Sequence, residues 1–164
     1  MLRDYQKDIC IRTVEAFRSH RSVMVQMPTG TGKTVVLASL VNSVEQDGAN
    51  ILIVAHRREL VEQIRETIHR LGIDDGRIMV CSIQWLTYNI NKVAIAPSLV
   101  VIDEAHHALA KTYRMMWKAW HEARFLGLTA TPCRMNRAGF TDLFDVLLTS
   151  HSIGQFIKEG WLSL

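Results

Sequence analysis

The sequence predicts an α/β fold in which a mostly parallel central sheet carries helices on both faces. Along the 164 residues, short apolar segments alternate with longer segments of helical periodicity. The short segments are apolar throughout, which is typical of parallel strands covered on both faces. Glycines and charged residues follow directly after several of these segments, where ligands gather in open α/β sheets.

Each element follows from its own pattern. Helical spacing of apolar residues predicts helices over 4–20, 33–46, 57–72, 84–90 and 108–120. Further helical patterns cover 139–149 and 152–160. The apolar face of 57–72 consists of Leu60, Val61, Ile64, Ile68 and Leu71. Gly72 is expected to cap the end of that helix.

Short apolar runs predict the strands. They cover 22–27, 50–56, 77–83, 98–105 and 124–132. Internal repeats, low-complexity tracts and evident linkers are absent from the sequence, so residues 1–164 are expected to form a single domain.

The composition is that of a globular protein, with 48% hydrophobic and 21% charged residues. No apolar run reaches the roughly 18 residues of a membrane-spanning helix, and the N-terminus lacks a signal-peptide pattern. We therefore expect a cytoplasmic protein without a membrane partner. The net charge of +3 permits contact with a polyanion without establishing it. The three cysteines are widely spaced, which favours reduced thiols over a disulfide framework or a zinc cluster.

A glycine loop follows the first strand. In GTGKT, residues 30–34, the glycines allow successive backbone N–H groups to point at an anion. Lys33 can reach terminal phosphates, and the Thr34 hydroxyl can bind Mg²⁺. The full pattern begins with glycine, whereas Met27 stands at that position here. The alternative is a glycine-rich turn with an incidental lysine.

Two carboxylates end the apolar run 98–105. Asp103 and Glu104 near a core would be costly unless paired, and a bound Mg²⁺ would remove that cost. Asp103 would then hold the metal, and Glu104 would orient or deprotonate an attacking water. The alternative is an N-cap of the following helix. His106 and His107 alone are weak support for zinc.

These stretches form an ordered set of motifs. The chain resembles the first RecA-like lobe of superfamily 2 helicases and translocases, which are P-loop NTPases with DEAD or DEAH boxes. The matching segments are LRDYQKDI (2–9, Q motif), MPTGTGKT (27–34, motif I), VAHRREL (54–60, motif Ia), CSIQWL (81–86, the next nucleic-acid-facing segment), DEAH (103–106, motif II) and TATP (129–132, motif III).

Two segments indicate a branch. LRDYQ and TATPCR are most similar to type III restriction enzyme-like motor subunits and related DNA translocases. RNA-directed DEAD-box proteins usually carry Asp where His106 stands and Ser-Ala-Thr where TAT stands. The resemblance therefore favours DNA over RNA as the partner.

The resemblance implies roles for individual residues. Gln6 would read the adenine edge, with Arg3 nearby. The residues expected to bind ATP phosphates and Mg²⁺ are Thr29, Gly30, Thr31, Gly32, Lys33, Thr34, Asp103 and Glu104. Those expected to couple nucleotide state to nucleic acid are His106, Thr129 and Thr131. Those expected to meet the phosphate backbone are His56, Arg57 and Arg58. Arg134 has a counterpart in the branch but receives no role.

The family binds ATP between two RecA-like lobes, and the second supplies an arginine that stabilises charge on the γ-phosphate. That lobe is expected to be absent from this chain, which would then hydrolyse ATP poorly alone. The leading interpretation is the ATP-binding lobe of a DNA helicase or translocase. The alternatives are an RNA helicase lobe, a non-motor ATP-dependent nucleic-acid-binding module and, least consistent with the motifs, a small-molecule kinase.

Overall fold

Helices and strands alternate along the chain. The computed structural model describes residues 4–27, 33–45, 48–73, 76–103, 110–129 and 146–149. The helices are α1 (Asp4–Ala16), α2 (Lys33–Glu45), α3 (Arg58–Arg70), α4 (Ile83–Asn89), the 3₁₀ helix η1 (Ile90–Lys92) and α5 (Ala110–Ala119). The strands are β1 (Ser22–Gln26), β2 (Ile51–Ala55), β3 (Ile78–Ser82), β4 (Leu99–Asp103), β5 (Arg124–Thr129) and β6 (Val146–Thr149).

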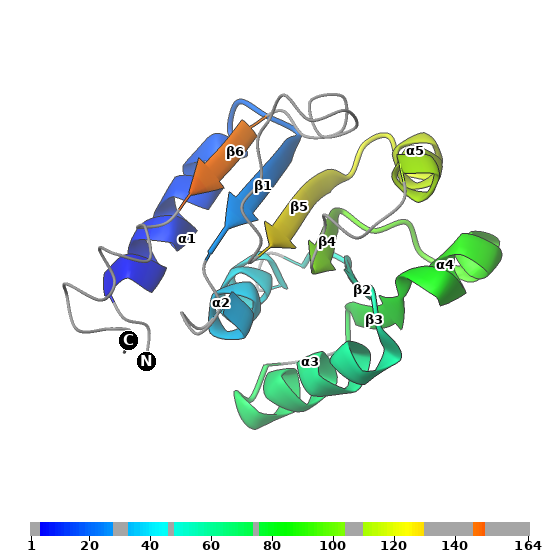
Figure 1. Ribbon diagram of the computed structural model, residues 1–164, viewed down its shortest axis with the longest axis horizontal. Coiled ribbons are helices and arrows are strands. Elements are labelled where there is room, and N and C mark those ends of the chain that lie inside the picture. Colours follow the sequence, from blue (N-terminus) through cyan, green and yellow to red (C-terminus); the bar gives the residue numbers. More distant parts are fainter. Residues whose placement is uncertain are drawn as a thin grey trace.

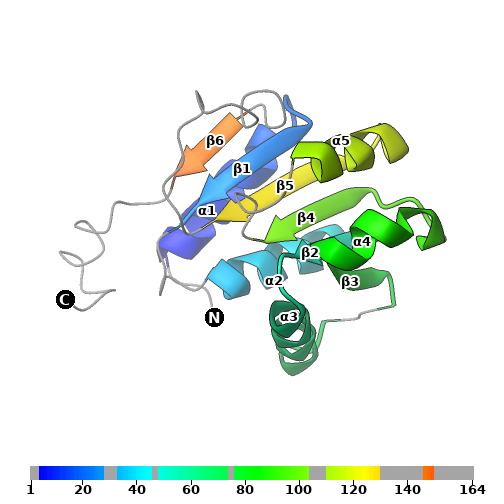
Figure 2. The ribbon, with the colours of Figure 1, turned by 45° about the vertical axis from the view of Figure 1, so that its right-hand side comes forward.

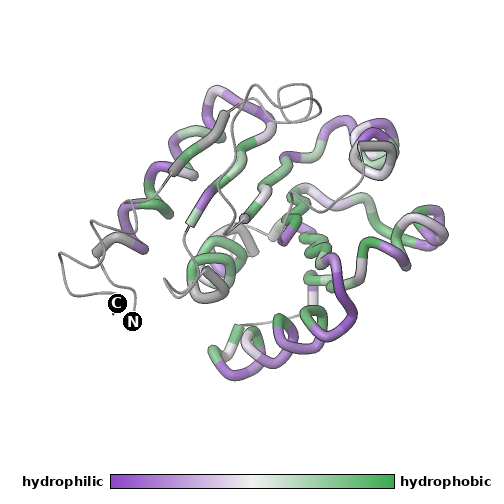
Figure 3. The backbone as a smooth tube through the Cα atoms, viewed as in Figure 1, coloured by the Kyte–Doolittle hydropathy of each residue, from purple (hydrophilic) through white to green (hydrophobic). Residues whose placement is uncertain are grey.

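The strands form one six-stranded sheet in the order β3-β2-β4-β5-β1-β6, and every pairing within it is parallel (Figure 1). Strands β2 and β4 are buried at every position, as expected for central strands of a covered sheet. In the hydropathy view the strands are mostly hydrophobic, whereas α3 alternates between hydrophobic and hydrophilic residues (Figure 3). The predicted fold class is confirmed.

Helices α1, α2 and α3 cover one face of the sheet. Ile9, Leu37 and Ile64 from these helices belong to one buried cluster with Val25 and Ile53 of the strands. Successive strand residues point to opposite faces, so the neighbours of these strand residues serve the other face. The first core therefore joins three helices that are consecutive in the sequence (Figures 1 and 2).

Helices α4 and α5 cover the other face. Leu86 of α4, Met116 of α5 and Trp120, the residue after α5, belong to a second cluster with Met24 and Leu52. The two clusters place helices on both sides of the sheet and hold the strand ends in a fixed relation to the helices that follow them.

The tryptophans of this second face pack in or against the core. Trp85 and Trp117 lie against the second cluster, and Trp120 belongs to it. The Trp117 and Phe125 rings are stacked, with centroids 3.6 Å apart. Trp161 lies outside the described residues.

The end of α3 confirms the glycine cap. Gly72 has φ +70°, its N–H donates to the His69 carbonyl, and the Ile73 N–H donates to the Ile68 carbonyl. This pair of hydrogen bonds is a Schellman motif, which satisfies carbonyls that have no partner inside the helix. Leu71, predicted on the apolar face, is 49% exposed because the helix ends at Arg70.

The prediction of a helix over 139–149 is wrong at its end. Residues Val146–Thr149 form β6, which pairs in parallel with β1, Val146 opposite Val23. Three apolar residues followed by a threonine show too little periodicity to separate strand from helix. The segment forms a strand because it pairs with β1. Residues 139–145 and the predicted helix 152–160 lie outside the described residues.

Candidate nucleotide and nucleic-acid site

The strand–loop–helix context of the phosphate loop is confirmed at both of its ends. β1 ends at Gln26 and α2 begins at Lys33, with Thr34 in its first turn. A helix that starts here directs its N-terminal N–H groups toward the carboxyl edge of the sheet. The intervening loop, which includes Thr29, Gly30, Thr31 and Gly32, lies outside the described residues.

Asp103 is the last residue of β4 and is only 7% exposed. It lies opposite Leu128 in β5, and the next β5 residue, Thr129, lies opposite Gln26 in β1. Neighbouring strands are about 4.8 Å apart, so Asp103 lies roughly 10 Å from the strand that leads to the phosphate loop. The strand end that carries Thr129 lies between them.

Thr129 is fully buried, and its carbonyl accepts a hydrogen bond of 2.9 Å from the Met27 N–H. That bond extends the pairing of β1 with β5 one residue past the strand, toward the phosphate loop. The main chain at the end of β5 is therefore hydrogen-bonded directly to Met27, the residue before the phosphate loop. Glu104, His106, Thr131 and Arg134 lie outside the described residues.

The residues present suit a hydrated Mg²⁺ ion. Mg²⁺ prefers oxygen ligands and is usually held by one or two carboxylates together with phosphate and water. Asp103 supplies a buried carboxylate on one strand end, and Thr34 is a residue of the first turn of α2. Among the described residues, no group of three or more His, Cys, Asp or Glu side chains could hold a metal by itself.

A second group of candidate residues follows β2. His56 is half-buried, and Arg57 occupies the N-cap position of α3 with φ −132° and ψ 146°. Arg57 and Arg58 are both exposed, and within the described part of the chain the Arg57 side chain makes no capping hydrogen bond. Two guanidinium groups therefore stand at the positive end of a helix, an arrangement that favours an anionic partner.

Gln84 is a residue of this region that the sequence did not single out. It lies in the first turn of α4, and its Nε2 donates a hydrogen bond of 3.1 Å to the main-chain oxygen of His56. The segment CSIQWL was matched as a whole, but no spacing rule identifies which of its side chains reaches the loop after β2. The contact depends on the pairing of β2 with β3.

Gln6 lies on α1, and its side chain is 5% exposed. The prediction that Gln6 reads an adenine edge stays a prediction, since burial at this position is compatible with packing alone. Arg3, its predicted neighbour, lies outside the described residues.

The described cysteines are unpaired thiols, as predicted. Cys10 and Cys81 are both free, and burial raises the pKa of each; for Cys81 it rises to about 12. Cys133 lies outside the described residues. Within the described ranges, the structure has no helix long and apolar enough to cross a membrane.

The parallel sheet, with α2 starting after β1 and a buried aspartate ending β4, defines a RecA-like P-loop NTPase lobe. A sequence model of the family described as type III restriction enzyme, res subunit, matches residues 1–134, and the chain belongs to that family. This confirms the assignment to the restriction-enzyme-like branch of superfamily 2.

Known proteins agree with this placement. The chain is 30% identical over 140 residues to a 51.5 kDa protein of a Lactococcus phage, covering 85% of this chain and 31% of that protein. It is 30% identical over 158 residues to the DNA 3'-5' translocase XPB2 of Sulfurisphaera tokodaii, covering 90% of this chain and 34% of that protein. The chain thus spans about a third of these relatives. The crystal structure of the UvsW helicase from bacteriophage T4 shares the fold, with a TM-score of 0.75, 18% identity and coverage of 90% of this chain and 59% of that one.

Proposed function

We propose that the chain is the ATP-binding lobe of a DNA helicase or translocase that couples ATP hydrolysis to movement on DNA. The observation that carries this proposal is the buried carboxylate of Asp103, which ends β4 on the same sheet edge at which α2 begins. Mg²⁺ prefers carboxylate oxygens together with phosphate and water, so an aspartate at this strand end suits a nucleotide-bound Mg²⁺.

The roles proposed for individual residues come from the sequence motifs to which they belong. The loop through Gly30 and Gly32, with Lys33, binds the phosphates of ATP, while Asp103 and Thr34 hold Mg²⁺. When bound, Mg²⁺ neutralises the negative charge that develops on the phosphates. Glu104 accepts the proton of the attacking water.

In this proposal the nucleic acid binds the residues that come directly after β2 in the sequence. Arg57 and Arg58 are exposed at the start of α3, where guanidinium and N–H groups suit a phosphate backbone. His106, Thr129 and Thr131 connect this surface to the nucleotide. The name of the XPB2 relative supports DNA, and RNA is the alternative partner.

A second RecA-like lobe completes the cleft in this proposal and supplies the arginine that stabilises the transition state. The 164 residues then form one ATP-binding domain of low activity, in the cytoplasm. Efficient turnover by a monomer of this chain would contradict the need for a second lobe.

The test is ATP turnover by the chain with and without single-stranded DNA, duplex DNA or RNA, beside Lys33→Ala. The proposal expects low turnover that Lys33→Ala abolishes, and greater stimulation by DNA than by RNA. Stimulation by RNA alone would identify an RNA motor. Nucleotide binding with no turnover under any condition, including after addition of a second lobe, would identify a non-motor binding module.

A further inference from the structure

The start of α3 and the start of α4 lie side by side. Ala55, the last residue of β2, pairs with Ser82, the last residue of β3, and α4 begins at the next residue. On the β2 side, only His56 and Arg57 separate the strand from α3. Two segments that are distant in the sequence therefore meet at one sheet edge.

Gln84 connects the start of α4 to the segment between β2 and α3. Its Nε2 donates to the His56 carbonyl at 3.1 Å, so the amide holds the peptide group that joins His56 to Arg57. The orientation of that peptide group sets the direction in which Arg57 leaves the backbone. Inside the helix, the N–H groups of Leu60 and Val61 donate to the Arg57 carbonyl, so Gln84 adds a second restraint, from outside the helix, on the peptide group before Arg57.

The first turn of α4, which carries Gln84, is held in place by two contacts. The Ser82 Oγ accepts a hydrogen bond of 3.1 Å from the Trp85 N–H, which fixes the first turn of α4. Leu86, two residues after Gln84, is fully buried in the second cluster and anchors the helix to the sheet. Gln84 therefore reaches the loop from a backbone that is held on both sides.

We propose that Gln84 is a positioning residue that orients Arg57 and Arg58 toward the phosphate backbone of a nucleic acid. This inference rests on the proposed function, because it assigns a purpose to the two arginines. Gln84 itself is exposed and uncharged. A direct contact of Gln84 with the ligand is the competing explanation, and the two differ in their dependence on the arginines.

The test uses Gln84→Met, which keeps the length of the side chain and removes the amide. Gln63→Met on α3 is the matched control, since Gln63 is also an exposed helical glutamine. Each change is made in the natural chain and in the Arg57→Ala/Arg58→Ala double variant. Binding to a fluorescein-labelled single-stranded oligonucleotide is measured by anisotropy between about 50 and 200 mM salt.

Gln84→Met is expected to weaken binding about 2- to 10-fold, the range of one lost hydrogen bond, and Gln63→Met less than about 2-fold. In the double variant, Gln84→Met should have no further effect. In the natural chain, Gln84→Met should also make the slope of log affinity against log salt less steep, because fewer phosphates are neutralised. The thermal midpoint of Gln84→Met should fall by no more than about 4 °C, the shift that corresponds to the loss of one hydrogen bond.

Three results overturn the inference. Equal losses in both backgrounds with an unchanged salt slope would show that Gln84 touches the ligand directly. Normal binding by Gln84→Met, when the double variant is weakened, would leave the proposed interface intact and remove the role of Gln84. Normal binding by the double variant would remove the proposed interface itself, and with it any positioning of these arginines.

Discussion

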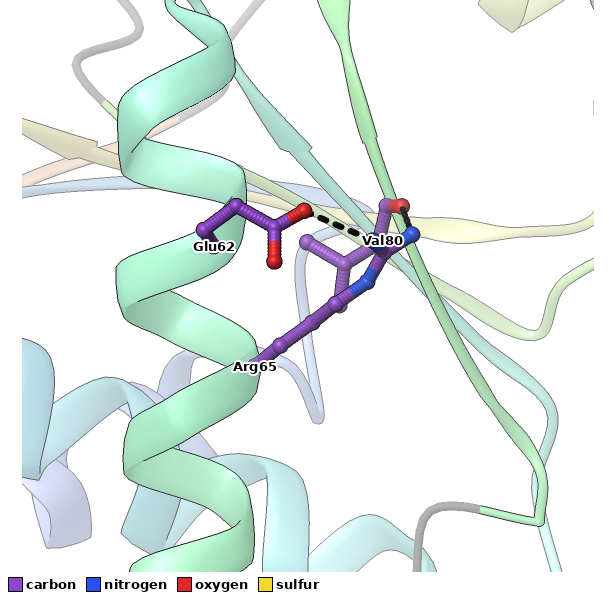
Figure 4. Close-up of polar contacts among 3 residues, drawn as sticks. All are labelled: Glu62, Arg65 and Val80. Atoms are coloured by element: carbon purple, nitrogen blue, oxygen red, sulfur yellow. Dashed lines mark hydrogen bonds and ion pairs between the residues drawn. The ribbon is translucent and has the colours of Figure 1, made fainter.

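Arg65 on α3 donates a hydrogen bond of 2.9 Å from Nη2 to the main-chain oxygen of Val80 in the edge strand β3, while its Nη1 lies 3.0 Å from Glu62 Oε1 (Figure 4). The Ile51 N–H bonds to the Arg77 carbonyl, so alternation along the ladder turns the Val80 carbonyl away from β2. Arg65 thus covers a polar group on an open sheet edge, where unpaired groups invite association.

Arg65→Ala should therefore lower the free energy of unfolding by about 1 kcal/mol, the typical worth of one hydrogen bond. Glu62→Ala is the control, because an exposed ion pair one helical turn apart is worth no more than about 0.5 kcal/mol. Urea denaturation of both variants measures the difference. Equal losses would mean that the ion pair, and not the Val80 contact, carries the stability.

Arg21→Ala should cost more, about 2 kcal/mol. The Arg21 side chain donates to the carbonyls of Ala123 and Trp120, both at 2.8 Å, and its Cζ lies 5.4 Å from the centre of the Phe125 ring. Hydrogen bonds to a charged group are stronger than neutral ones, and these are partly buried. Chemical denaturation beside Arg18→Ala, at an exposed arginine on the turn after α1, tests this; similar losses in both variants would contradict it.

Gly72→Ala should destabilise the protein by about 1 kcal/mol, because an L residue is strained at φ +70°. A Cβ added at this glycine would meet nothing within 4 Å, so the cost is conformational and not a clash. Gly72→Asn should lose less, since asparagine tolerates this region. Thermal unfolding of the two variants checks the order, and a larger loss for asparagine would refute the backbone explanation.

Cys81 should resist alkylation in the folded protein. Burial raises the pKa of its thiol from 9.0 to about 12, while nearby Arg65 opposes the shift, so the thiol stays neutral at ordinary pH. Iodoacetamide treatment at pH 8.5, followed by peptide mapping, should modify Cys81 only when urea is present. Rapid modification of the native protein would show that the site opens.

The same shift predicts a pH dependence. Because the folded pKa is raised, the contribution of Cys81 to stability is complete below pH 9 and declines as the pH rises toward 12. Cys81→Ala should flatten the loss of stability between pH 9 and 11, measured by urea midpoints. A parallel curve for the variant would assign the alkaline loss to other groups.

Asp103→Asn should lower ATP turnover about 100-fold or more if Asp103 holds the metal, since metal-ion stabilisation of a phosphoryl-transfer transition state is worth several kcal/mol. The amide is nearly the same size, so the protein should fold. Circular dichroism confirms folding while turnover is measured. Unchanged turnover would separate Asp103 from the metal.

The local patterns were sufficient for most of the architecture. Buried strands such as Ile51–Ala55 are apolar at every position, and the helix Arg58–Arg70 has a clear periodicity and a glycine cap. The site candidates Lys33 and Asp103 were found because glycines and carboxylates directly after apolar strands have few structural explanations. The prediction failed at Val146–Thr149, where three apolar residues and a threonine suit either a helix or a strand.

By itself the sequence determined which residues are candidates for the chemistry, because phosphate and metal ligands require particular side chains at particular spacings along one loop or strand end. Only the tertiary structure decided which strand ends are neighbours. The placement of β5 between β1 and β4 sets the separation of Asp103 from the strand that precedes the phosphate loop, and the pairing of Ser82 with Ala55 brings Gln84 to His56. These relations join residues distant along the chain, and they depend on the order in which parallel strands pair, which no local pattern encodes.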